Sequence, residues 1–188
     1  LVFVWQRKER MRAMKNILIV VDMQKDFVDG ALGSKESVGI VDNVVAKIQD
    51  FEGDVIATYD THVENYMDTQ EGKKLPVPHC IKGTDGWKLD QKVQEALDKK
   101  GFIEVYKPTF GSVDLVEVIR KYDVENIAIQ LVGLCTDICV VSNALLLKAN
   151  FPEMNISVDA ACCAGVTPQK HQAALETMSS CQIEVLNA

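Results

Sequence analysis

Alternation between short apolar runs and segments with helical spacing is the feature of this sequence that most constrains its fold. Runs rich in β-branched residues, bounded by polar or turn-forming residues, are typical of strands that are covered on both faces. The predicted strands are Asn16–Val21, Val55–Tyr59, Phe102–Tyr106, Ile127–Val132, Ile156–Ala160 and Ile183–Leu186. Such runs indicate a sheet whose strands are mostly internal.

Helical periodicity occupies most of the intervals between these runs. The predicted helices are Ser37–Phe51, Lys88–Lys99, Gly111–Tyr122, Thr136–Ala149 and Thr167–Ser179. Helical crossovers between successive strands imply a mostly parallel sheet. We therefore expect an α/β fold, a three-layer sandwich in which a mostly parallel sheet of about six strands is flanked by helices.

The length of the chain fits one domain with one sizeable core. It has 188 residues, of which 47% are hydrophobic and 25% charged. Met14 precedes the first strand, so we expect the domain to span residues 14–188. Residues 1–13 would then be a leader that is either disordered or packed on a partner. The leader places apolar residues before its positive charges, unlike a secretory signal, and no apolar run reaches the ~18 residues of a membrane span.

Charge and cysteine usage narrow the class of protein. The net charge of −7 and the pI near 5.0 argue against nucleic acid or an anionic membrane surface as partner. The six cysteines lie mostly in segments predicted to be buried strands, in a chain too large to need disulfides. We interpret them as reduced, which predicts a cytoplasmic protein.

Chemically active residues follow four of the predicted strands. They are Asp22, Asp60, Lys107 and the turn from Cys135 to Cys139. The carboxyl ends of parallel strands share one edge of the sheet, where ligands bind near a switch in strand order. Each residue alone has a structural explanation, because strand-end aspartates cap turns and lysines are usually solvated. Together, an acid, a base and a thiol in one cleft favour nucleophilic catalysis.

Two thiols lie in the turn after the fourth strand. Thr136 occupies the expected N-cap position of the following helix. A cysteine in the first helical turn lies near the positive end of the helix dipole, which favours the thiolate and predicts a nucleophile. The alternative is that Cys135 and Cys139 are small buried hydrophobic residues.

The long polar stretch 61–85 contains a candidate metal site. Asp60 and His62 form a D-x-H at a strand end, and His79 lies in the same stretch, whereas His171 falls on a predicted surface helix. Carboxylate and imidazole groups suit zinc, manganese or iron. The alternative is that these side chains make hydrogen bonds that shape the loop.

Three motifs carry a resemblance to a known family. They are VVDMQKDF at Val20–Phe27, VYKPTFGS around Lys107, and VGLCTDIC ending at Cys139. In their order and spacing the chain resembles the isochorismatase-like cysteine hydrolases, the superfamily that includes nicotinamidases. The resemblance covers Asn16 to Leu186 and implies that superfamily's Rossmann-like α/β fold.

The resemblance implies a role for each residue of the turn. Cys139 would be the nucleophile, with Asp22 as proton acceptor and Lys107 as their charged partner. A cis peptide bond would join Leu134 to Cys135. The backbone N–H groups of Cys135 and Cys139 would form the oxyanion hole that stabilises the intermediates.

The resemblance also implies a metal set and a substrate pocket. The metal ligands would be Asp60, His62 and His79, with Glu71 as a further carboxylate and Asp68 as a weaker candidate. The cofactor would be a divalent ion, zinc in the first place, with manganese or iron as alternatives; it would orient the ring of the substrate. The predicted pocket residues are Phe27, Leu134 and Phe110. The pattern departs from nicotinamidases at Pro76, beside Leu75, and at Asp114, where that family has aromatic residues.

The predicted function is hydrolysis of nicotinamide to nicotinate and ammonia, a step of NAD salvage, through a thioester on Cys139. One alternative is another small-amide or ureide hydrolase of the same superfamily. A second is a non-catalytic α/β binding module, against which the intact set of Asp22, Lys107 and Cys139 argues. The resemblance also implies a homo-oligomer.

Overall fold

A single parallel sheet forms the centre of the molecule. The computed structural model describes residues 15–188, so the predicted leader 1–13 lies outside the described residues. The strands are β1 (Lys15–Val21), β2 (Asp54–Asp60), β3 (Ile103–Lys107), β4 (Ile127–Leu134), β5 (Asn155–Ala164) and β6 (Glu184–Leu186). Their order is β3-β2-β1-β4-β5-β6, and every neighbouring pair is parallel.

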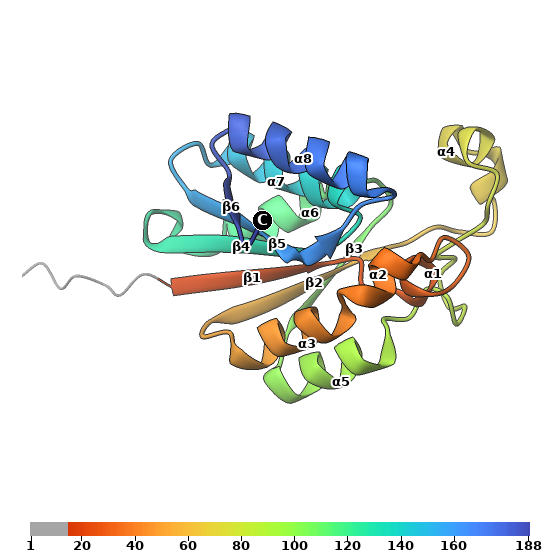
Figure 1. Ribbon diagram of the computed structural model, residues 1–188, viewed down its shortest axis with the longest axis horizontal. Helices are drawn as coiled ribbons and strands as arrows, with labels where there is room; N and C mark the ends of the chain where they lie inside the picture. Colours follow the sequence, from red (N-terminus) through yellow and green to blue (C-terminus); the bar gives the residue numbers. More distant parts are fainter. Residues whose placement is uncertain (1–14) are drawn as a thin grey trace, which may run out of the picture.

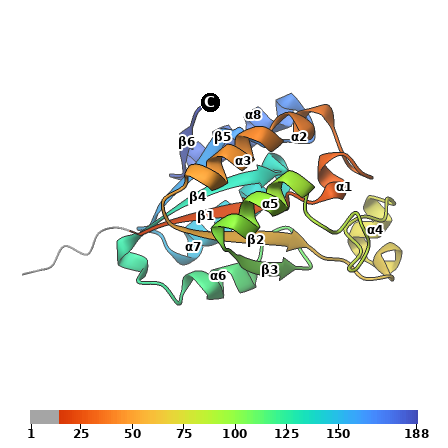
Figure 2. The ribbon, with the colours of Figure 1, turned by 90° about the horizontal axis from the view of Figure 1, so that it is seen from below.

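Helices cover both faces of the sheet (Figure 1). Figure 2 shows α3 and α5 crossing one face, and α6, α7 and α8 lie on the other. The helices are α1 (Lys25–Val28), α2 (Lys35–Gly39), α3 (Val41–Asp50), α4 (Gln70–Lys74), α5 (Gln91–Lys100), α6 (Val113–Ile119), α7 (Val141–Asn150) and α8 (Pro168–Ser180). The predicted three-layer α/β sandwich is confirmed, and the sheet is entirely parallel.

Strand β1 explains why the apolar run at its position is continuous. Ile17 to Val21 are fully buried. Because side chains alternate across a strand, Ile17, Ile19 and Val21 enter the core beneath α6, α7 and α8, while Leu18 and Val20 enter the core beneath α3 and α5. Both faces of the strand are therefore apolar, as a doubly covered sheet requires.

The strand order reverses between β1 and β4. The chain moves outward from β1 through β2 to β3, and then returns to place β4 on the other side of β1. Figure 1 shows α1, α2 and α4 beyond the carboxyl ends of the strands. This edge of the sheet, at the switch in strand order, is where the predicted site residues lie.

The predicted helix Ser37–Phe51 is wrong in its extent, because two helices occupy the segment. Helix α2 ends at Gly39, α3 begins at Val41, and Ile40 lies between them. Glycine has poor helix propensity, so the chain changes direction here at little cost. Ser34, not Ser37, caps α2 by accepting a hydrogen bond from the Ser37 N–H at 3.0 Å.

The predicted end of the fourth strand at Val132 is also wrong. Strand β4 continues through Gly133 to Leu134, with an irregular register against β5 at this point. Gly133 has a φ of 116°, and a Cβ there would lie 2.2 Å from the Val21 carbonyl oxygen. Glycine therefore marks the close approach of β1 and β4, not the start of the turn.

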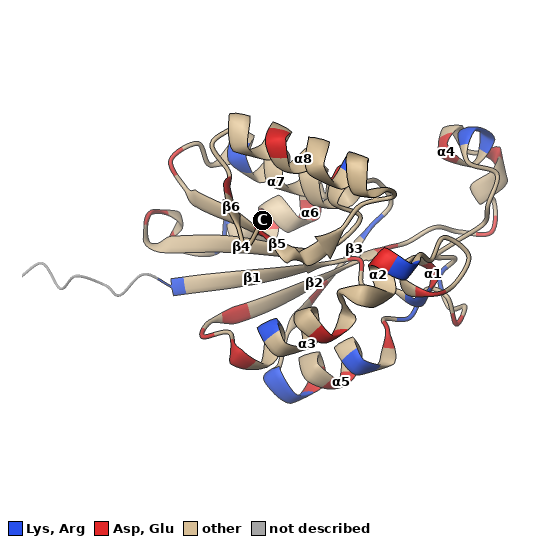
Figure 3. Cartoon of the chain, viewed as in Figure 1, with Lys and Arg blue, Asp and Glu red and all other residues tan. Residues whose placement is uncertain are grey.

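Apart from the buried Asp22, Asp60, Lys107 and Asp159, the Asp, Glu, Lys and Arg residues within 15–188 are at least partly exposed. Figure 3 shows Lys and Arg interspersed with Asp and Glu on α3 and α5. Within residues 15–188, none of the helices is long and apolar enough to cross a membrane.

Candidate active site and metal centre

Three predicted residues meet at the carboxyl ends of β1, β3 and β4. The Lys107 ammonium lies 2.6 Å from Asp22 Oδ2 and donates a hydrogen bond to the Cys139 sulfur at 3.3 Å. Asp22 and Lys107 are fully buried, and Cys139 is nearly so. The structure thus brings together an acid, a cation and a thiol that are far apart in the sequence.

The backbone of Asp22 directs its carboxylate into this cluster. Asp22 follows the last residue of β1 and has a φ of 46°, which turns the chain out of the sheet. Its N–H donates to the Thr58 carbonyl at 3.2 Å, and the Thr58 hydroxyl donates to Asp22 Oδ1 at 2.6 Å. Oδ2 is left to face Lys107.

Burial controls the protonation of the cluster. It raises the pKa of Asp22 above its ordinary value, against the opposing charge of Lys107. Burial alone would lower the pKa of Lys107, but the neighbouring negative groups, chiefly Asp22, outweigh it and raise that pKa. A lysine that stays charged can stabilise a developing thiolate, and a carboxylate with a raised pKa is a better proton acceptor.

The sequence predicts that the helix dipole favours a thiolate at Cys139, but the burial of this residue acts in the opposite direction. Burial raises the pKa of the thiol well above its ordinary value, and the Asp22 charge adds to this effect. Desolvation therefore outweighs the attraction of Lys107. A proton must leave Cys139 for a nucleophile to form, and the adjacent Asp22 carboxylate is placed to accept it.

The turn that carries Cys139 is a π-helical segment, Thr136–Val140, that leads into α7. The peptide bond between Leu134 and Cys135 is cis, as the resemblance implies. The predicted N-cap role of Thr136 is wrong: the residue before the segment is Cys135, and the Thr136 hydroxyl pairs with His171 Nδ1 at 2.8 Å. His171 is thus not a plain surface residue, because it ties α8 to the turn.

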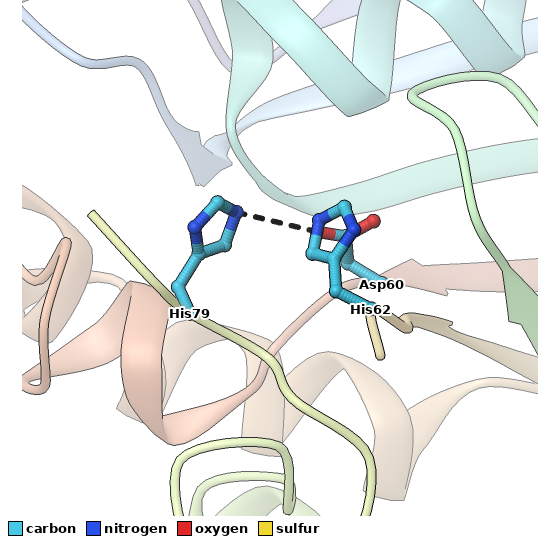
Figure 4. Close-up of side chains that lie close together, drawn as sticks. All are labelled: Asp60, His62 and His79. Carbon is cyan, nitrogen blue, oxygen red and sulfur yellow. Dashed lines mark ion pairs between the residues drawn. The ribbon is translucent and has the colours of Figure 1, made fainter. Parts of the chain in front are cut away.

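A second cluster lies beside the first. Asp60 ends β2, and Figure 4 shows the imidazoles of His62 and His79 directed at its carboxylate. His62 Nε2 lies 3.0 Å and His79 Nε2 3.6 Å from Asp60 Oδ2. All three residues are buried. Burial favours a raised pKa for Asp60, but the adjacent imidazoles of His62 and His79 outweigh it and lower that pKa.

The residues present fit a divalent metal. His62 Nε2 is buried and lies 3.0 Å from Asp60 Oδ2, but it makes no well-aligned hydrogen bond among the described residues, so its lone pair is free to coordinate a cation. His79 Nδ1 pairs with the Val77 carbonyl at 2.8 Å, which leaves Nε2 directed at the cluster. Ligands bound tetrahedrally at about 2.0–2.2 Å from zinc lie about 3.3 Å apart, close to the spacings between Asp60 and the two histidines.

Glu71 is the fourth group of the cluster. Its Oε1 lies 3.7 Å from the Nε2 atoms of both His62 and His79. It comes from α4, which Thr69 caps by accepting a hydrogen bond from the Gly72 N–H. Asp68, the weaker candidate, is exposed on the preceding 3-10 turn, Tyr66–Asp68. The stretch 61–85 is therefore partly helical, not the irregular loop that its sequence suggests.

A cavity of about 400 Å³ opens above both clusters. Cys135, Cys139, Asp60 and His79 line it, and so does the predicted pocket residue Phe27. The Phe27 ring meets the His79 ring edge to face, with centroids 5.4 Å apart.

The other two predicted pocket residues differ in their placement. Phe110 lines the cavity, but Leu134 does not. The Leu134 side chain is fully buried in the core beneath α3 and α5. The Leu134 backbone contributes to the site through its peptide bond to Cys135, whereas its side chain contributes only to core packing.

Sequence reasoning missed two polar residues inside the VVDMQKDF motif. The buried Gln24 side chain accepts from the Asp60 N–H at 2.7 Å and donates to the Asp60 carbonyl at 2.9 Å. Asp26 Oδ2 accepts from the Cys80 N–H at 2.8 Å and so holds the segment next to His79. Gln24 lies between β1 and α1, where neither strand nor helix periodicity predicts burial, so the sequence pattern gives no signal for it.

Asn143 is a third residue that was missed. It is fully buried on α7, one helical turn after Cys139, and its Nδ2 donates to the Cys139 carbonyl at 2.8 Å. The same nitrogen donates to the Phe110 carbonyl at 3.1 Å, and Oδ1 accepts from the Ser112 N–H at 2.9 Å. Asn143 thus joins the turn that carries Cys139 to the segment after Lys107. An asparagine within an apolar helical stretch is the signal.

The fold and site define a class of protein. The isochorismatase domain family matches residues 16–188. Because that match spans nearly the whole described chain, the protein belongs to the isochorismatase family.

Particular relatives are similar over most of their length. An uncharacterized isochorismatase family protein of Bacillus subtilis strain 168, PncA, is 31% identical over 145 residues, which cover 70% of this chain and 78% of that protein. The crystal structure of the nicotinamidase/pyrazinamidase PncA from Bacillus subtilis has a TM-score of 0.81 and 28% identity, covering 93% of this chain and 100% of that chain.

A more distant solved structure shares the fold. The pyrazinamidase of Pyrococcus horikoshii, solved in complex with zinc, has a TM-score of 0.74 at 24% identity, covering 93% of this chain and 99% of that chain. In sequence and fold the protein is therefore similar to nicotinamidases and pyrazinamidases.

Proposed function

We propose that the protein hydrolyses nicotinamide to nicotinate and ammonia. The observation that carries the proposal is the contact of Lys107 with both Asp22 and Cys139, directly beneath a cavity that Cys139, Asp60 and His79 line. Similarity to the nicotinamidase/pyrazinamidase of Bacillus subtilis supports the choice of substrate.

The first half of the reaction forms a thioester. Asp22 accepts the proton of the Cys139 thiol while the Lys107 charge stabilises the thiolate. The sulfur attacks the amide carbon, and the backbone N–H groups of Cys135 and Cys139 bind the oxyanion. Asp22 then returns the proton to the leaving nitrogen, the C–N bond breaks and ammonia departs.

The second half returns the enzyme to its starting state. Asp22 takes a proton from a water molecule, which attacks the thioester carbon. The C–S bond breaks, nicotinate leaves, and the proton on Asp22 goes back to the Cys139 sulfur. Asp22 thus takes up and returns a proton twice, and the nicotinic acid product loses its own proton to solvent, which balances the hydrolysis.

The proposed metal ligands are Asp60, His62, His79 and Glu71. A bound divalent ion would supply a Lewis acid that coordinates a ring nitrogen and fixes the carboxamide over Cys139. Zinc heads the candidates, because imidazole and carboxylate ligands at these spacings suit it, and manganese or iron are the alternatives. Gln24 and Asp26 would keep these ligands in place through the backbones of Asp60 and Cys80.

A cytoplasmic location is part of the proposal, and all six cysteines are free. Self-association into a homo-oligomer stays a prediction.

The nucleophile assignment is tested by comparing two cysteine variants. Cys139→Ala should lower ammonia release by ~10⁴-fold or more, because no other group can form the covalent intermediate. Cys135→Ala keeps its backbone N–H, so we expect activity within about tenfold of the wild type. A coupled ammonia assay at saturating nicotinamide measures both. An active Cys139→Ala with an inactive Cys135→Ala would refute the assignment.

A further inference from the structure

The cavity above Cys139 changes character from its floor to its mouth. The floor is polar and almost fully buried; it consists of Cys139, Asp60 and His79. The mouth carries large apolar side chains that are open to solvent. Leu75 is 38% exposed, Phe110 46% and Val166 48%. Exposed apolar side chains that gather around one cavity mark a binding surface, whereas scattered ones need no explanation.

Each mouth residue comes from a different segment, and each segment is held by hydrogen bonds. Leu75 follows α4, and its carbonyl accepts from the Tyr66 hydroxyl at 2.9 Å. Asn143 binds the Phe110 carbonyl at 3.1 Å. The Val166 N–H donates to Asp137 Oδ1 at 2.9 Å. The apolar mouth is therefore a preformed surface, which reduces the cost of binding.

The cavity is larger than the substrate of the proposed reaction needs. Even at the about 30 Å³ that a water molecule occupies in the liquid, the nine non-hydrogen atoms of a pyridine carboxamide fill only about 270 Å³. The cavity measures about 400 Å³. When the carboxamide lies over Cys139, space remains toward the mouth.

We infer that the preferred substrates are heteroaromatic primary amides that carry an apolar substituent on the ring, which contacts Leu75, Phe110 and Val166. The inference rests on the proposed amidase function and names its substrate class. Lys170, an exposed cation, also lines the cavity. An anionic substituent would pair with Lys170, but three apolar side chains outweigh one amine that water already solvates.

The test compares nicotinamide with derivatives that carry methyl or propyl groups at ring carbon 4, 5 or 6. For at least one ring position, the KM should fall by up to about fourfold for each methylene that the mouth buries, with kcat little changed. Leu75→Ser and Val166→Ser should each remove most of the difference in KM between the propyl derivative and nicotinamide itself. Val113→Ser is the matched control, because Val113 is 68% exposed and lies outside the cavity.

Three other results have distinct meanings. If nicotinamide is hydrolysed and no alkyl derivative has a lower KM, the inference about the mouth is overturned and the amidase function stands. It is also overturned if a carboxylated derivative is preferred and Lys170→Met removes that preference. If neither nicotinamide nor any derivative releases ammonia, the proposed function fails and the substrate class fails with it.

Discussion

Asp60 is the residue that joins the two halves of the site. Its Oδ1 lies 3.3 Å from the Lys107 ammonium, while its Oδ2 faces both histidines. One carboxylate therefore contributes to the charge balance around the thiol and to the metal set. A group shared in this way would fix the distance between the proposed nucleophile and a bound metal, which suits a small rigid substrate that must touch both.

The proposed metal ligands can be tested by changing single residues. Purified wild-type protein should contain about one divalent ion per chain, and His62→Ala should lose it, because the variant lacks one of the buried imidazole ligands. Elemental analysis by mass spectrometry measures the metal content directly, without reference to activity.

His171→Ala is the matched control for this prediction. His171 contacts Thr136 in the turn that carries Cys139, and it is not one of the proposed metal ligands. The variant should therefore keep its metal. Wild-type protein that is metal-free and fully active would contradict the assignment of Asp60, His62 and His79.

Residues at strand ends could be predicted because a parallel sheet gathers them at one edge. Asp22, Asp60 and Lys107 needed only the strand assignments. The supporting residues could not be found in this way. Asn143 acts through the backbone carbonyls of Cys139 and Phe110, contacts that depend on how α7 meets a loop from another strand.

Helix α8 matters to the site because its first turn lines the cavity. Thr167 caps it: the Thr167 side chain accepts from the Lys170 N–H at 3.2 Å, and Pro168 occupies the first turn. Thr167→Ala should lower the free energy of unfolding by ~1 kcal/mol, because the helix loses this acceptor. Urea denaturation followed by circular dichroism measures the change.

Thr167→Ser keeps the hydroxyl and serves as the control. Its free energy of unfolding should stay within about 0.5 kcal/mol of the wild type. Equal stability of Thr167→Ala and wild type would contradict the capping role.

The helices show where apolar periodicity is not a sufficient guide to secondary structure. Apolar spacing located the helix at residues 37–51 but could not separate α2 from α3, because Ile40 is buried and keeps the apolar pattern across the break. The π-helical turn before α7 was equally hidden. Its residues also have helical spacing, and only the contact between Thr136 and His171 shows that the threonine is not a cap.

At the scale of the whole molecule, the strand order explains why one cleft can contain both clusters. The carboxyl ends of β1 and β4 flank the switch point and supply Asp22 and the Cys139 turn. The end of β2 lies next to β1 and supplies Asp60, and the end of β3 lies next to β2 and supplies Lys107, which is paired in register with Asp60. The parallel sheet was predicted from alternation alone, but its order depends on tertiary packing that the sequence pattern does not encode.

The choice of substrate depends on the whole cavity. The central claim, hydrolysis of nicotinamide, is tested most directly by one measurement. Purified wild-type protein, loaded with zinc, is incubated separately with nicotinamide, pyrazinamide, a ureidoacrylate-type compound and isochorismate, and the products are identified by liquid chromatography with mass spectrometry. We predict nicotinate and ammonia in equal amounts from nicotinamide, and no product from isochorismate. Turnover of the ureido compound or of isochorismate, with no nicotinate formed from nicotinamide, would contradict the account.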